Sequence, residues 1–163
     1  MGVGVGQIKV VVTAFVEMEG ECDLVVLTEP DSGRYVTVPF GEELFIQLCG
    51  IFNEPGEPLI GQEFTVAALK SAGVSIASIT LRLVNPISRE IAFTIALQHG
   101  EREWTMPAMG FDALGCSIAS HVPILVDEAE FQAMVSDSES STTPEDAAIR
   151  LAQTLPNSKI GQS

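Results

Sequence analysis

The segment from Trp104 to Val126 constrains the fold most, because it places a helix between two strands. Met106-Pro107 ends a strand-like alternation. Apolar residues then recur at spacings of three and four, which is one face of a helix: Phe111, Leu114, Ile118 and Val122. Pro123 stops that helix, and Ile124-Leu125-Val126 is typical of a short buried strand. A strand reached through a helix needs a crossover connection, so this segment predicts a mixed sheet.

The remaining apolar patterns predict strands before and after two more helices. Strands are expected at residues 7–19, 23–28, 34–40, 75–84, 89–98, 101–106 and 124–126. Helices are expected at Glu42–Ile51, Glu63–Ala72 and Asp112–Val122, with a further helical turn at Glu128–Met134. The spacing predicts inner residues on the first two helices: Leu44, Leu48, Ile51 and Phe52, then Phe64, Ala67 and Ala68. The fold class is therefore α+β, with a mixed, largely antiparallel β-sheet and about three packed helices.

Composition divides the chain into two parts. Residues 1–135 contain the expected elements and are interpreted as one α+β domain. Residues 136–163 begin with an acidic, serine-rich linker, and Thr143-Pro144 then indicates the start of a short amphipathic helix. Such a helix is too short to be stable alone in water. Three arrangements stay open for it: docking on the core, packing on a partner subunit, or fraying.

The total charge limits which binding partners are expected, and the cysteines indicate the cellular compartment. Eight basic residues face 22 acidic ones, which gives a net charge of −14. Nucleic-acid-binding proteins gain most of their affinity from Lys and Arg contacts to phosphate, so this charge disfavours tight nucleic-acid binding. No apolar run reaches the roughly 18 residues of a membrane span, so no membrane association is expected. Three widely spaced cysteines suit a reducing compartment, and a cytoplasmic location is expected.

Carboxylates stand at each expected helix start and are the candidate metal ligands. Glu42, Glu63 and Asp112 would gather at one place if the helix starts converge. Carboxylate oxygens are the ligands that hard divalent cations such as Mg²⁺ prefer. Each residue also has a structural interpretation, because negative charge in the first turn complements the helix dipole and Asp112 can cap its helix. Cys116, within the third helix, is expected to be a small core residue.

Several motifs resemble those of the bifunctional nuclease (BFN) domain family, over roughly residues 10–131. Asp112-Ala113, followed by Pro123-Ile124-Leu125-Val126, resembles the family's Asp-Ala pair and its Pro-Ile-x-Val strand. Gly33-Arg34 resembles the Gly-Arg that opens a strand in the family. Two positions that carry arginine in the family hold Glu57 and Met109 here.

The resemblance implies a divergent nuclease that hydrolyses DNA and RNA phosphodiesters weakly and with a divalent metal. Glu63 and Asp112 align with the family's Thr-His-Asp and Ser-Asp-Ala motifs and are the expected catalytic residues. Glu63, Asp112 and Glu42 are the expected ligands of Mg²⁺ or Mn²⁺, and no other cofactor is expected. Homo-oligomerisation is expected from the apolar content of 46%, from an exposed edge strand and from the resemblance. The alternatives are a non-catalytic oligomeric binding or scaffold module of the same fold, and a small-molecule binder with a pocket between helices and sheet.

Overall fold

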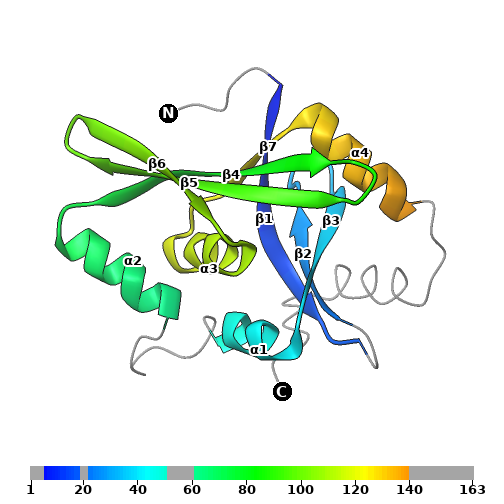
Figure 1. Ribbon diagram of the computed structural model, residues 1–163, viewed down its shortest axis with the longest axis horizontal. Helices are drawn as coiled ribbons and strands as arrows, with labels where there is room; N and C mark the ends of the chain where they lie inside the picture. The colour runs from blue at the N-terminus through cyan, green and yellow to red at the C-terminus, as the bar shows by residue number, and fades with distance from the viewer. Residues whose placement is uncertain (1–5, 19–21, 51–60, 140–163) are drawn as a thin grey trace.

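The computed structural model describes residues 6–18, 22–50 and 61–139, and this part of the chain forms one seven-stranded sheet with four helices (Figure 1). The strands are β1 (Gln7–Val16), β2 (Asp23–Thr28), β3 (Tyr35–Phe40), β4 (Ser75–Asn85), β5 (Glu90–His99), β6 (Arg102–Ala108) and β7 (Ile124–Asp127). The helices are α1 (Glu42–Gly50), α2 (Gly61–Ser71), α3 (Gly110–Ser120) and α4 (Glu128–Glu139). The predicted α+β class is confirmed.

The sheet is mixed, as the crossover at the third helix predicts. Its strand order is β3-β2-β1-β7-β4-β5-β6. Strands β4 and β7 pair in parallel, and every other neighbouring pair is antiparallel. Helix α3 returns the chain from the edge strand β6 to the middle of the sheet, where β7 joins the two antiparallel groups. The crossover therefore determines which strands become neighbours in the centre.

A bulge in β1 lets one strand contribute to two apolar clusters. The pairing with β2 shifts between Val12 and Ala14, so Thr13 is the extra residue. Val10 and Phe15, five positions apart, consequently belong to the same main cluster. In a regular strand they would point to opposite faces. The main core is continuous from β1 through α1 and α3 to α4.

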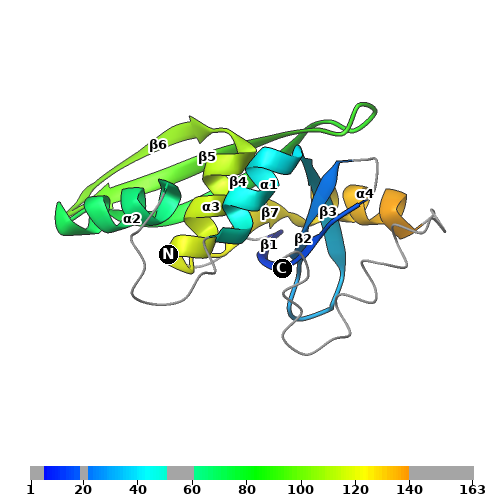
Figure 2. The same ribbon diagram turned by 90° about the horizontal axis from the view of Figure 1, so that it is seen from below.

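The helices occupy different ends of the molecule. Figures 1 and 2 show α2 beside α3 at one end and α4 at the other, with α1 next to α3. Helix α3 is the most deeply embedded, because residues 113–118 are buried on every side of the helix. Leu114 and Ile118 lie in the core as predicted, and Phe111 and Val122 pack against it.

The predicted inner face of α1 is confirmed at Leu48 and wrong at Leu44. Leu44 is 39% exposed, whereas Phe45, Leu48 and Cys49 are buried. Both apolar stripes have helical spacing, so periodicity alone does not choose between them. Phe45 faces inward because its ring meets the edge of Phe15, with ring centroids 5.7 Å apart.

The predicted inner face of α2 is also wrong. Phe64 is 63% exposed and Ala68 is exposed, whereas the polar Gln62 is buried. Among the apolar residues of α2, Val66 packs against the core. Helix α2 ends at Ser71, within one residue of the predicted end. Gly73 then adopts a positive φ of 79°, and the Gly73 and Val74 amides donate to the carbonyls of Lys70 and Leu69.

Two segments named from the sequence extend past the described residues. Helix α4 continues to Glu139, four residues into the range interpreted as a linker. The rest of that linker and the amphipathic segment after Thr143 lie outside the described residues. Ile51, Phe52 and Glu57 lie outside them as well.

Candidate functional site

The first turns of α2 and α3 are in direct contact through Gln62. Its buried amide nitrogen Nε2 donates to Oδ1 of Asp112 over 3.3 Å. The aliphatic part of the same side chain lies over Gly115, where an added Cβ would stand only 2.6 Å from Cγ and Cδ of Gln62. Glycine at position 115 is therefore what allows the two helices to approach at this point.

Asp112 is not the helix cap that the sequence predicts. The N-cap of α3 is Met109, which has extended backbone and, among the described residues, no side-chain capping hydrogen bond. Asp112 lies in the first turn instead and is exposed, with Gln62 as its hydrogen-bond donor. The amides at the start of α3 consequently lack a side-chain acceptor, and a helix N-terminus of this kind attracts anions.

The helix starts approach one another, but their carboxylates do not form a three-ligand centre. Glu63 is half-buried, directly after Gln62, and Glu42 is exposed in the first turn of α1. The start of α3 lies near the end of β3, since a Cβ on Gly110 would stand 3.6 Å from the Phe40 ring. Within the described residues no group of three or more His, Cys, Asp or Glu side chains could hold a metal ion.

Divalent cations differ in how many protein ligands they need. Mg²⁺ commonly keeps several waters and uses one or two carboxylates together with substrate phosphates, whereas Ca²⁺ and Zn²⁺ sites draw more ligands from the protein. A site of the first kind here would need the carboxylates of Glu63 and Asp112 to lie close together. Glu42, on the neighbouring helix α1, is not part of a three-ligand group with them.

A groove of about 500 Å³ runs along α2 from Glu63 to Lys70 and is closed by residues 119–122 at the end of α3. Its apolar lining includes Val66 and Val122, and Lys70 and His121 line it near the helix ends. His121 is the C-cap of α3, with a left-handed φ of 58°. Within the described residues the side chains of Glu63, Lys70 and His121 have no hydrogen-bond or ion-pair partner.

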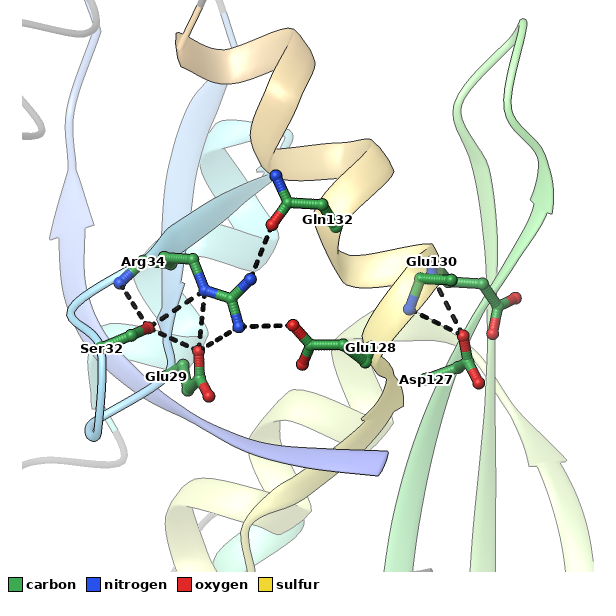
Figure 3. A network of polar contacts seen from close by, with 8 residues as sticks. Glu29, Ser32, Arg34, Asp127, Glu128, Glu130 and Gln132 are labelled. Carbon is green, nitrogen blue, oxygen red and sulfur yellow. Dashed lines mark hydrogen bonds and ion pairs between the residues drawn. The ribbon is translucent and has the colours of Figure 1, made fainter. Parts of the chain in front are cut away.

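The most extensive polar cluster is centred on Arg34, the residue that resembles the family's Gly-Arg motif (Figure 3). Its guanidinium donates to Glu29 over 2.6 and 2.9 Å, to Glu128 over 2.9 Å and to Gln132 over 2.6 Å. The guanidinium also lies 5.3 Å from the ring centroid of Phe131. These partners join the β2–β3 turn to the start of α4. The cluster therefore holds the fold together at this end, away from α2 and α3.

The same cluster shifts two pKa values. Hydrogen bonding from the Ser32 hydroxyl, and then from the Arg34 guanidinium, lowers the pKa of Glu29. The hydrogen bonds to Glu29 and Glu128 raise the pKa of Arg34. Both shifts favour the charged forms that make the contacts.

The buried thiols are chemically inert in the folded chain. Burial raises the pKa of Cys116 to about 11, and the nearby charge of Asp112 adds to the effect. Burial, with the charges of Glu17 and Asp23, also raises the pKa of Cys49 to about 11. A protonated thiol is a poor nucleophile. Cys116 is thus the small core residue that the sequence predicts.

The roles of three residues in this region were not predicted from the sequence. Gln62 is a buried polar residue on a helix face where an apolar one is expected, and Lys70 resembles an ordinary last-turn cation. Gly115 did carry a signal, because a glycine inside a helical pattern often marks close packing. The predicted pair Glu63 and Asp112 does lie on adjacent turns, as the Gln62 contact shows.

Comparison with known proteins adds no assignment: no family model matches the chain, and no curated protein matches it. The helices of the described residues are all too short or too polar to cross a bilayer.

Proposed function

We propose that the protein is a divergent member of the bifunctional nuclease family, and that it hydrolyses DNA or RNA phosphodiesters weakly with Mg²⁺ or Mn²⁺. The observation that carries the proposal is the contact between the first turns of α2 and α3. Gln62 bridges them, so that Glu63 and Asp112 lie on adjacent turns. These are the two acidic residues that align with the family's motifs.

Each residue of this region has a distinct role in the proposal. Glu63 and Asp112 would hold the cation, which when bound would supply positive charge to the phosphate and lower the pKa of a water molecule. Gln62 is a positioning residue, since its hydrogen bond orients the Asp112 carboxylate. The uncapped amides at the start of α3 offer donors to a phosphate oxygen.

The activity is expected to be weak because, among the described residues, neither carboxylate is paired with an arginine. Met109, at the start of α3 and 75% exposed, occupies a position that carries arginine in the family. Losing a single stabilising donor typically lowers the rate about a hundredfold to a thousandfold.

The test is cleavage of fluorescent single-stranded DNA and RNA oligonucleotides by the purified chain, with Mn²⁺, Mg²⁺ or EDTA. We expect slow cleavage that EDTA abolishes and that Asp112→Asn and Glu63→Gln reduce about a hundredfold. Glu43→Gln, an exposed first-turn acid on α1, is the matched control and should keep full activity. Metal-independent cleavage that survives Asp112→Asn would place the activity elsewhere.

A second candidate is a non-catalytic binding module that self-associates in a reducing compartment. It is favoured by the scattered carboxylates, which leave no three-ligand metal group within the described residues. Strand β6 forms one edge of the sheet, and apolar Met106 and Met109 are exposed on it and just after it. An edge strand with exposed apolar side chains promotes association. Sedimentation should show an oligomer at tens of micromolar, roughly where ordinary interfaces are populated; a monomer there would contradict this candidate.

A further inference from the structure

The groove along α2 and α3 carries opposite charges at its two ends. Glu63 lies in the first turn of α2, and Lys70 lies seven residues later in the last turn. Two helical turns bring residues seven apart back to nearly the same face, and the rise of 1.5 Å per residue separates them by about 10 Å. Both line the same groove.

His121 adds a second donor at the Lys70 end. Gln62, in the first turn of α2, meets Gly115 in the middle of α3. His121, directly after α3, lines the groove together with Val74 and Ile76, which follow Lys70 along the chain. His121 holds a left-handed backbone conformation as the C-cap of α3, and residues in such conformations occur often at binding sites.

The lining between the two ends is largely apolar. Side chains from α2, β4, α3 and the connections that follow α2 and α3 contribute to it: Val66, Leu69, Val74, Ile76, Ala119 and Val122. A volume of about 500 Å³ lies in the range of small-molecule sites. The three polar side chains at the ends have no partner within the described residues, so a ligand would not have to displace one of those residues.

We propose that this groove binds a linear zwitterion, with its carboxylate at Lys70 and His121, its ammonium at Glu63 and its apolar chain on the floor between them. The match in charge and in length defines the ligand class. A simple anion would meet Glu63 and a simple cation would meet Lys70, so a molecule with one charge satisfies only half of the site. This inference does not rest on the proposed hydrolysis, but the two proposals share Glu63, where a divalent cation and the ammonium would compete, so binding is measured without divalent metal.

The probe is 8-aminooctanoate, whose extended length is comparable to the separation of the charged ends. Binding is followed by NMR shift changes of the full chain, with octanoate and octylamine as single-charge controls. We expect 8-aminooctanoate to bind more tightly than either, with shifts centred on residues 63–76 and 119–122. Binding should weaken as salt is added, because Lys70 and His121 are exposed to solvent.

Substitutions at Lys70 and His121 test the end of the groove that takes the carboxylate. Lys70→Gln and His121→Asn should each weaken 8-aminooctanoate and octanoate up to about fivefold, the range of an exposed ion pair, and leave octylamine unchanged. Asparagine is chosen because it tolerates the left-handed backbone of His121. Lys9→Gln, an exposed cation on β1, is the control and should change nothing.

Three results would overturn the proposal. The first is the absence of shifts with all three probes at millimolar concentration. The second is equal binding of octanoate and 8-aminooctanoate, which would mean that only the apolar floor contributes. The third is an equal effect of Lys9→Gln and Lys70→Gln. Nuclease activity is read separately, so a failure here leaves the hydrolysis proposal intact and the reverse also holds.

Discussion

Replacing Arg34 by methionine should destabilise the protein more than any other single change to a surface cation. Methionine keeps an apolar stem against Phe131 but removes every hydrogen bond to Glu29, Glu128 and Gln132. The Glu29 side chain is only 12% exposed, so it would lose its guanidinium partner in a largely desolvated position. Breaking a fully buried pair costs about 3–5 kcal/mol and an exposed pair contributes about 0–1 kcal/mol. Arg34 itself is 26% exposed, and we expect a loss of about 3 kcal/mol.

Arg82, in strand β4, provides a matched control because its guanidinium also pairs with an acid of α4. Its guanidinium pairs with Glu130 of α4 over 3.2 Å, but the Arg82 side chain is 64% exposed. Arg82→Met should therefore cost less than about 1 kcal/mol. Urea denaturation at one fixed protein concentration measures the stability loss of both variants. The unfolding midpoint should move, and the dependence of the unfolding free energy on urea concentration should stay unchanged. For a chain of this size the Arg34 variant should melt about 6–12 °C lower. If the two variants lie within about 1 kcal/mol of each other, the clamp between the β2–β3 turn and α4 is not a major source of stability.

Three further outcomes follow from the same contacts. Gly115→Ala should destabilise the chain by about 1–3 kcal/mol in urea. Gln62→Ala in the same chain should recover part of the loss, because the three atoms nearest to the new Cβ all belong to Gln62. Iodoacetamide at pH 8 should label the exposed Cys22 and spare Cys49 and Cys116, whose pKa values are raised to about 11, until the chain unfolds; mass spectrometry of digests reads this out. The folded pKa of Glu29 lies below its ordinary 4.5, so its stabilising effect is fully present above pH 4.5 and is lost as the pH falls through the lower folded value. Glu29→Gln should make the free energy of unfolding less dependent on pH below 4.5. An unchanged pH dependence would contradict the stabilising role of ionised Glu29.

The sequence predicted the elements well because period-two and helical spacings are local properties. Both hairpin regions and the crossover helix appear where the alternation places them, within a few residues. The bulge at Thr13 was not predictable, since it depends on how β1 pairs with β2. The expected strand consequently ran past Val16, where β1 ends.

The inner faces of α1 and α2 were mispredicted for a physical reason that local spacing does not contain. On α1 two apolar stripes compete, and the position of Phe15 decides between them. On α2 the space over Gly115 is filled by the stem of Gln62 while its amide reaches Asp112, so a polar residue faces inward and Phe64 faces outward. The same tertiary contact brings Glu63 and Asp112 to adjacent turns. From the sequence, this proximity could be expected only if the helix starts converge.

The central claim is that Glu63 and Asp112 bind a divalent cation at the adjoining starts of α2 and α3. Paramagnetic broadening by substoichiometric Mn²⁺ in amide NMR spectra of the full chain tests it most directly. We predict that the strongest broadening falls on residues 61–65 and 110–114, and that Asp112→Asn removes it while Glu43→Gln does not. Broadening centred on the acidic start of α4 at Glu128 and Glu130, or unchanged in Asp112→Asn, would contradict the claim.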